Sequence, residues 1–101
     1  MSYRIRFTLD AEDDLMRLFD FLLEQDIGIA EKAEAAIYKA IELLEFFPFS
    51  CRKADDEEYN SLVRELLIPF GGAGYVALFK IENNETVTVI AIRHQREDDY
   101  H

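Results

Sequence analysis

Five side chains in the second half of the sequence could do chemistry on a phosphate group: Arg64, Arg93, His94, Arg96 and Tyr100. A metal-free ribonuclease needs a group that takes the 2′-hydroxyl proton, cations that stabilise the charged phosphorane, and an acid for the leaving oxygen. These five residues are the candidates for those roles if the chain is a nuclease. Arg64, Arg93, His94 and Arg96 are also the candidates for binding a macromolecular target without any chemistry.

Each of these side chains also has a structural interpretation. A histidine at a strand end is more often a hydrogen-bonded rim residue than a proton shuttle. Arg64 and Arg93 could simply hold the tail to a sheet by pairing with Glu65, Glu97, Asp98 and Asp99. Tyr100 could be a stacking platform or part of a disordered end. Because His101 is the only other imidazole, we expect neither a metal site nor a cofactor.

The composition predicts one small globular domain spanning residues 1–101. Half of the residues are hydrophobic and 32% are charged, which argues against disorder. The formal net charge of -10 makes binding to nucleic acid unfavourable except through a local basic patch. The segment from Asp10 to Asp26 contains seven acidic residues and one basic residue, Arg17. The negative charge is therefore concentrated in the helices and loops, whereas the strands are mildly basic.

The sequence also indicates the compartment. The amino terminus has no apolar core like that of a signal peptide, and no apolar run approaches the ~20 residues that span a bilayer. The single cysteine, Cys51, is typical of a reducing compartment and is interpreted as an inert thiol. We therefore expect a cytoplasmic protein without a membrane partner.

The segment that must position the candidate residues is a predicted β-hairpin. Residues 73–82 and 85–94 are rich in β-branched and aromatic residues, and Asn83-Asn84 between them tolerates positive φ. Both predicted strands are apolar at nearly every residue, which suits central strands that are partly covered on their second face.

The preceding chain supplies the elements that cover this hairpin. Residues 3–8 alternate as a half-buried strand with Tyr3, Ile5 and Phe7 on one face. The acids from Asp10 to Asp14 are interpreted as the first turn of a helix rather than a metal site. That helix is expected to end near Asp26, with an apolar face formed by Ala11, Leu15, Leu18, Phe19, Leu22 and Leu23 and widened by Met16 and Phe21.

A second helix and a further strand complete the pattern. Ala30, Ala33, Ile37, Ala40, Ile41 and Leu44 recur at helical spacing, and Pro48 ends the helix. Residues 49–60 predict a polar, solvated connection, and residues 62–68 a strand. The fold class is therefore α+β with two layers: an N-terminal strand, a helical hairpin and a three-stranded antiparallel meander, forming one four-stranded sheet.

The whole chain resembles the ParE branch of the RelE/ParE toxin superfamily. The resemblance rests on the element order and on Phe47-Pro48, Val63-Arg64-Glu65-Leu66, the segment 74–79 and above all the segment 89–98. It implies a toxin of a type II toxin-antitoxin (plasmid stabilisation) module, neutralised by a cognate ParD-like ribbon-helix-helix antitoxin whose carboxyl-terminal segment wraps around it. ParE-like members poison DNA gyrase, whereas RelE-like members cut messenger RNA on the ribosome.

Three functions remain open under this resemblance, and gyrase inhibition is the preferred one. Members often have an arginine where this chain has Val76, and the RelE branch is generally rich in lysine and arginine. The nuclease is therefore the alternative, followed by an inactive homologue that acts only as a binding partner. We expect the target to bind the sheet's open face and the tail from Arg93 to Tyr100.

The antitoxin is expected to bind elsewhere on the molecule. We assign its contact to Phe19, Leu22, Tyr75 and Phe79. The helical aromatics Phe19, Phe21, Phe46 and Phe47 are expected in the core, and any that is exposed would mark the antitoxin surface. The antitoxin segment should carry basic residues that face the acidic helix.

Overall fold

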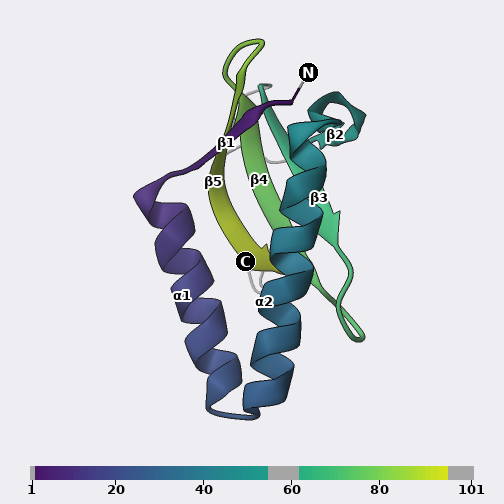
Figure 1. Ribbon diagram of the computed structural model, residues 1–101. Coiled ribbons are helices and arrows are strands. Elements are labelled where there is room, and N and C mark those ends of the chain that lie inside the picture. The colour runs from purple at the N-terminus through teal and green to yellow at the C-terminus, as the bar shows by residue number, and fades with distance from the viewer. Residues whose placement is uncertain (1, 55–61, 96–101) are drawn as a thin grey trace.

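The computed structural model describes residues 2–54 and 62–95, which form a sheet with a helical hairpin on one face (Figure 1). The helical layer consists of α1 (Leu9–Leu23) and α2 (Ile27–Glu42), followed by two short 3₁₀ turns, η1 (Leu43–Glu45) and η2 (Pro48–Ser50). The strands are β1 (Arg4–Phe7), β2 (Arg52–Lys53), β3 (Val63–Ile68), β4 (Tyr75–Ile81) and β5 (Thr86–His94). The predicted two-layer α+β class is confirmed.

Within residues 2–54 and 62–95, the sheet has five strands in the order β1-β5-β4-β3-β2, one more than the sequence predicted. β1 runs parallel to β5, and every other neighbouring pair is antiparallel. The additional strand, β2, lies in the segment predicted to be a polar connection. It has two charged residues and therefore no periodicity to detect, and its Arg52 forms an ion pair with Glu65 of β3.

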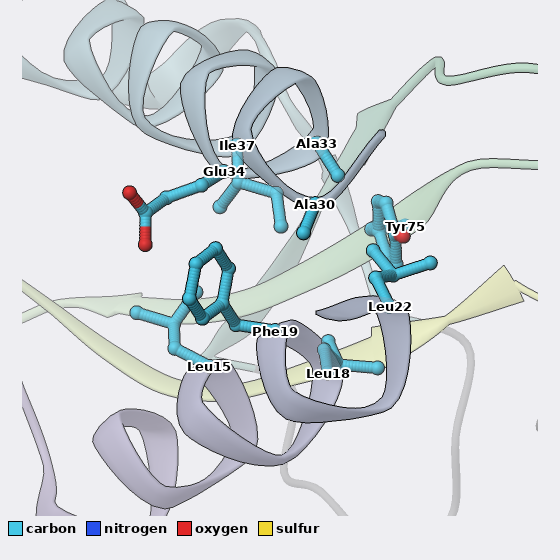
Figure 2. Close-up of a pocket in the computed structure, with 9 residues that line it drawn as sticks. All are labelled: Leu15, Leu18, Phe19, Leu22, Ala30, Ala33, Glu34, Ile37 and Tyr75. Carbon is cyan, nitrogen blue, oxygen red and sulfur yellow. The ribbon is translucent and has the colours of Figure 1, made fainter. Parts of the chain in front are cut away.

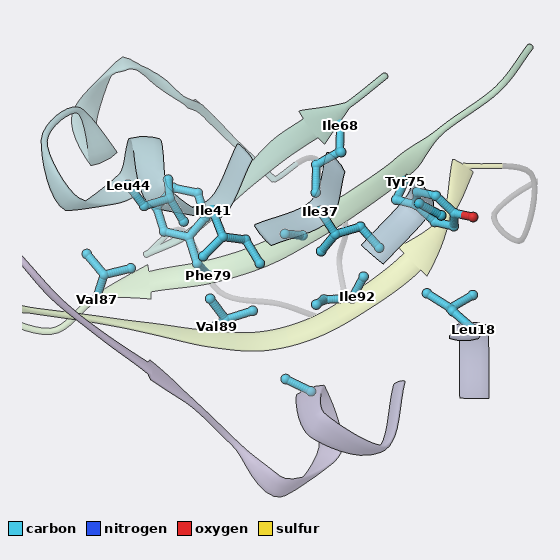
Figure 3. Close-up of a cluster of buried hydrophobic side chains, with 13 residues drawn as sticks. Leu18, Ile37, Ile41, Leu44, Ile68, Tyr75, Phe79, Val87, Val89 and Ile92 are labelled. Carbon is cyan, nitrogen blue, oxygen red and sulfur yellow. The ribbon is translucent and has the colours of Figure 1, made fainter. Parts of the chain in front are cut away.

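The core lies between the sheet and the helical hairpin (Figure 3). The predicted apolar face of α2 is confirmed, because Ala30, Ala33, Ile37 and Ile41 are buried. β4 and β5 contribute Phe79, Val87, Val89 and Ile92, each with no exposed surface. The hairpin predicted from the sequence therefore supplies the middle of the sheet.

A second apolar cluster lies on the sheet face that points away from the helices, here called the outer face. It contains Val63, Val76, Leu78 and Ala91, all at least nine-tenths buried. A β-bulge places two residues of β5, Ile90 and Ala91, opposite the single residue Leu78 of β4. The side chains of these two consecutive residues therefore both pack on the outer face. This cluster confirms that the central strands are covered on both faces.

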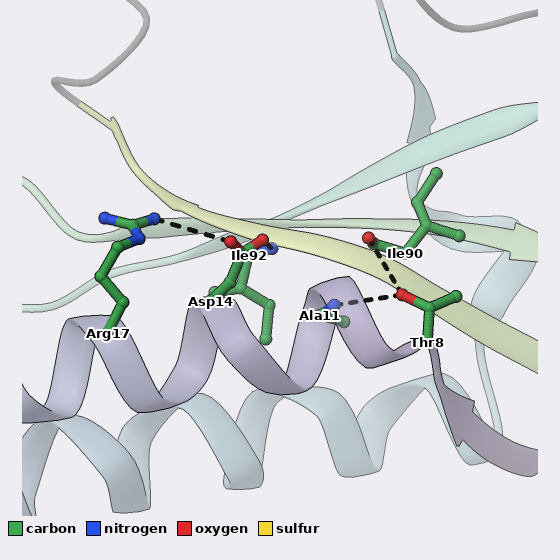
Figure 4. A network of polar contacts seen from close by, with 6 residues as sticks. All are labelled: Thr8, Ala11, Asp14, Arg17, Ile90 and Ile92. Carbon is green, nitrogen blue, oxygen red and sulfur yellow. Dashed lines mark hydrogen bonds and ion pairs between the residues drawn. The ribbon is translucent and has the colours of Figure 1, made fainter.

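Helix α1 is capped by Thr8, and side chains at its start bind the edge of β5 (Figure 4). Thr8 Oγ1 accepts a hydrogen bond from the Ala11 amide and donates one to the carbonyl oxygen of Ile90 at 3.2 Å. Asp14 Oδ2 accepts a hydrogen bond from the Ile92 amide at 2.9 Å. Because β1 ends at Phe7, side chains of α1 replace a neighbouring strand along this part of β5.

The helix boundaries differ from the expectation. α1 ends at Leu23, and Asp26 is instead the N-cap of α2, where its carboxylate accepts from the Ile29 amide at 3.1 Å. Acidic residues do occupy the first turn of α1, as expected from the helix dipole. Within the described residues, neither helix is long and apolar enough to cross a membrane.

Candidate functional site

Arg64 faces the helical side of the sheet at the β3 end near η2. Its Nη1 donates a hydrogen bond to the Cys51 carbonyl oxygen at 2.6 Å, and its guanidinium lies 5.4 Å from the centre of the Phe49 ring. A cation above an aromatic face is favourable when partly shielded from water. Arg64 therefore fastens the β2 region to β3, a role different from the carboxylate pairing considered from the sequence.

Arg93 and His94 lie at the end of β5, on opposite faces of it. Arg93 pairs in register with Val76 of the outer-face cluster. His94 pairs with Tyr75, and its ring meets the Tyr75 ring edge-on at a centroid distance of 5.5 Å. His94 is thus a ring-contacting rim residue on the helical side. The other two candidates, Arg96 and Tyr100, lie outside the described residues.

Arg64 and Arg93, which the sequence grouped as candidates for binding one target, do not form one cationic patch. Arg64 pairs with Phe79, which faces the helices, whereas Arg93 pairs with Val76, which faces away from them. Residues opposite each other in antiparallel strands point to the same face, so the two arginines lie on opposite sides of the sheet. The sequence does not reveal this separation, because assigning side chains to faces in a nearly all-apolar strand needs the register.

This separation limits the chemistry of the described part of the chain. Cleavage of RNA needs a proton acceptor, a cation and a proton donor within hydrogen-bond reach of one phosphate. Among the described candidates, Arg64 is on the helical face, Arg93 is on the outer face and His94 is packed against Tyr75. Those three residues do not converge on one point. Residues 2–54 and 62–95 also contain no group of three metal-ligating side chains.

Two of the predicted antitoxin contacts lie in the core. Phe79 has no exposed surface, so the prediction that it touches an antitoxin is wrong. Tyr75 is 3% exposed, and desolvation by burial raises its pKa above the usual value of 10.0. The apolar character that suggested binding reflects the packing of a central strand.

The other two predicted contacts, Phe19 and Leu22, line a seam between α1 and α2 (Figure 2). Phe19 and Leu15 point across the gap toward Ile37 of α2, and Ala30 and Ala33 let the helices approach closely. On the surface above them lies a groove of about 290 Å³, lined by Phe7, Glu12, Leu15, Met16, Phe19, Glu34 and Tyr38. Sequence reasoning missed Tyr38 and Glu34 as parts of this groove.

Several apolar side chains expected in the core are exposed instead. Met16 and Phe21 are 64% and 60% exposed, so they do not widen the buried face of α1. Phe46 and Phe47 are 57% and 60% exposed at the end of η1, where the chain leaves the helical layer. Helical periodicity cannot reveal this, because the width of a buried stripe depends on what packs against it.

A second groove, of about 640 Å³, opens at the other end of the helical hairpin. It is lined by Arg17, Leu18, Phe21, Leu22, Gln25, Phe70, Gly72, Ala73, Tyr75 and His94. The groove brings the exposed Phe21 near His94 at the end of β5. The two residues are 73 positions apart, so the sequence gives no sign that they are close. His94 is thus shared between the predicted target surface and this groove.

Cys51 is half-buried beside Arg64. Burial raises the pKa of the Cys51 thiol, and the nearby Arg64 charge lowers it by a smaller amount. A raised pKa leaves less thiolate at neutral pH, which agrees with the interpretation of Cys51 as an unreactive thiol.

Comparison with known proteins adds two findings. The model of the family described as ParE toxin of type II toxin-antitoxin system, parDE, matches residues 5–99. A solved structure described as a chromosomal ParDE TA system from P. aeruginosa superposes with a TM-score of 0.75 at 18% sequence identity, covering 92% of this chain and 96% of that one. No curated protein matches the sequence. At this identity, the structural likeness shows the fold alone.

Proposed function

This chain belongs to the ParE toxin family of type II toxin-antitoxin systems, and on that premise we propose that it inhibits DNA gyrase until a cognate antitoxin neutralises it. The observation that carries the proposal is the family match across residues 5–99, which includes the whole terminal hairpin. Gyrase acts on chromosomal DNA, so the proposed site of action is the cytoplasm.

The distribution of cations favours gyrase inhibition over RNA cleavage. Arg64 and Arg93 lie on opposite faces, and Arg64 already binds a carbonyl oxygen and an aromatic ring. A protein inhibitor needs a complementary surface but no convergent acid and base. We assign target binding to the end of β5, where Arg93 on the outer face and His94 on the helical face follow each other, and to Arg96 and Tyr100, which come next in the sequence.

The proposal is tested with purified toxin, gyrase and plasmid DNA. We expect loss of supercoiling and accumulation of cleaved plasmid, and growth arrest with intact transcripts when the chain is expressed alone. Arg93→Ala should weaken inhibition several-fold, whereas Lys39→Ala, which removes one exposed charge from α2, should not. Cleaved transcripts on translating ribosomes, with gyrase unaffected, would establish the nuclease instead.

The antitoxin partner follows from the family, and its ribbon-helix-helix type is part of our proposal. We assign its docking surface to the groove above the α1–α2 seam. Met16 and Tyr38 are 64% and 46% exposed there, and in the described residues Glu12 and Glu34 form no ion pair. An apolar floor between unpaired carboxylates suits an antitoxin segment that carries apolar side chains flanked by lysine or arginine.

Matched charge reversals test this surface. Glu34→Lys should weaken the complex with the co-expressed antitoxin at least tenfold, because it places a cation against the expected basic segment. Glu24→Lys makes the same change at the exposed end of α1, outside the groove, and should leave the affinity unchanged. If the two variants bind the antitoxin with equal affinity, the antitoxin does not dock in this groove. That result would leave the proposal of gyrase as the target unaffected.

A further inference from the structure

Three residues of the outer face lie in one row across three neighbouring strands. Arg6 of β1 pairs with Thr88 of β5, and Thr88 pairs with Lys80 of β4. β1, β5 and β4 lie side by side in Figure 1. With strands about 4.8 Å apart, the Cα atoms of Arg6 and Lys80 are roughly 10 Å apart, with Thr88 between them. We propose that this row, extended by Arg4, binds phosphates of a duplex DNA backbone.

The cations of the row are available to a ligand. Arg4 and Arg6 are exposed, and in the described part of the chain neither side chain forms an ion pair or hydrogen bond. Lys80 Nζ lies 3.6 Å from Glu82 Oε1, and both side chains are more than a third exposed. Such a surface pair contributes little and yields readily to a more highly charged partner.

The hydroxyl of Thr88 is the second observation that points to a ligand. Thr88 is 8% exposed, and its Oγ1 is buried without a hydrogen-bond partner. An unpaired buried hydroxyl is costly, and few are left in native structures. The flanking arginine and lysine have long, flexible stems, so an anion drawn between their charges can accept a hydrogen bond from this hydroxyl. Phosphate oxygens are strong acceptors for such a donor.

Among the described residues, the two layers differ in charge, although the formal net charge of the chain is -10. The helical layer carries the acids Asp10, Glu12, Asp13, Asp14, Asp20, Glu31, Glu34 and Glu42 against Arg17, Lys32 and Lys39. On the opposite side, the ladder register gives Arg4, Arg6, Lys80 and Arg93 the same face, which also carries Glu65 in an ion pair with Arg52. Within residues 2–54 and 62–95, this difference in charge favours the outer face over the helices as the side that meets DNA.

The spacing of the cations favours a chain of phosphates over one small anion. Arg4 and Arg6 are two residues apart on β1, which separates their Cα atoms by about 6.6 Å. A row of cations with this spread can contact several successive phosphates of one chain. The choice of DNA over RNA rests on the proposed function, because the proposed target, gyrase, acts on duplex DNA.

The test is the salt dependence of binding to a fluorescent 20-base-pair duplex, measured by anisotropy with the toxin alone. Three phosphate contacts predict a slope of log affinity against log salt of about -2.7, a loss of about 40-fold between 50 and 200 mM salt. Arg6→Gln/Lys80→Gln should reduce the loss to about 3.5-fold, since one contact remains. The control Lys32→Gln/Lys39→Gln makes the same charge change on α2 and should retain the parental slope.

Thr88→Val separates the hydroxyl from the charges. It should weaken DNA binding about tenfold with an unchanged slope, because a neutral hydroxyl releases no counterion. Without DNA, the Thr88→Val variant should be at least as stable to unfolding as the parent, because the substitution removes an unpaired buried hydroxyl. Unchanged affinity in this variant would overturn the assignment of Thr88.

The outcomes also separate this site from the proposed function. Equal slopes for the parent and Arg6→Gln/Lys80→Gln would overturn the phosphate site, even if gyrase inhibition persists. A reduced slope in that variant, with no gyrase inhibition by the parent, would keep the site and overturn the proposed function. Tighter binding to single-stranded RNA than to the duplex would overturn the choice of DNA.

Discussion

The contact between Asp14 and β5 yields a quantitative prediction about stability. The carboxylate of Asp14 accepts the Ile92 amide at 2.9 Å at the place where β1 no longer covers the edge of β5. Ile92 itself has no exposed surface. Asp14→Ala would leave this amide without its partner, which costs about 1–3 kcal/mol, and a bond to a charged acceptor belongs at the upper end.

Two further variants divide the effect into its parts. Asp14→Asn keeps an oxygen that can accept the amide proton but loses the charge, so we expect a cost of about 1 kcal/mol. Arg17→Ala removes the partner that lies 3.7 Å from the carboxylate, and with 53% of the arginine side chain exposed we expect a cost of about 0–1 kcal/mol. Alanine is a better helix former than aspartate, which offsets about 0.5 kcal/mol of the Asp14→Ala cost.

The assay is urea unfolding followed by circular dichroism, with the melting temperature as a second measurement. A net loss of about 2 kcal/mol should lower the melting temperature by roughly 8–16 °C in a domain of this size. Amide hydrogen exchange at Ile92 should accelerate in Asp14→Ala and much less in Asp14→Asn. If Asp14→Ala is no more destabilising than Arg17→Ala, the reasoning that α1 completes the edge of β5 is refuted.

Three other predictions concern stability. Gly74→Ala should lower the free energy of unfolding by at least about 3 kcal/mol, because Gly74 has φ 114° and a Cβ there would lie 2.3 Å from the Ile68 carbonyl oxygen. Gly71 has φ 59° and open space around it, so Gly71→Ala should cost about 1 kcal/mol in the same urea series. Thr8→Ala should cost about 1–2 kcal/mol and Thr8→Ser clearly less, because serine retains the oxygen that caps α1; a similar loss in both would contradict the capping role. Because burial raises the pKa of Tyr75 in the folded state, stability should fall as the pH rises from about 10 through that higher pKa, and Tyr75→Phe should lose less stability than the parent between pH 9 and pH 11. Parallel curves for the parent and Tyr75→Phe would show that the tyrosine ionises equally in both states.

Local patterns in the sequence were sufficient for most of the elements. The terminal hairpin, the strand before it and the buried stripe of α2 each follow from periodicity and turn residues that act over a few positions. The resemblance to a toxin family also rested on linear motifs, and the family match over residues 5–99 agrees with it. The strand β2 could not be predicted in this way, because its two charged residues are too few to show an alternation of apolar and polar side chains.

Apart from β2, the sequence by itself therefore determined the types and order of the main helices and strands, and the family, because these depend on neighbours along the chain. Only the tertiary structure decided that Arg64 and Arg93 lie on opposite faces, that Phe79 is core, and that Arg6, Thr88 and Lys80 share one row. The physical reason is the two-residue period of a strand: a shift of one position in register exchanges the faces of every side chain. That register is set by pairing between residues far apart in the sequence, such as β1 with β5.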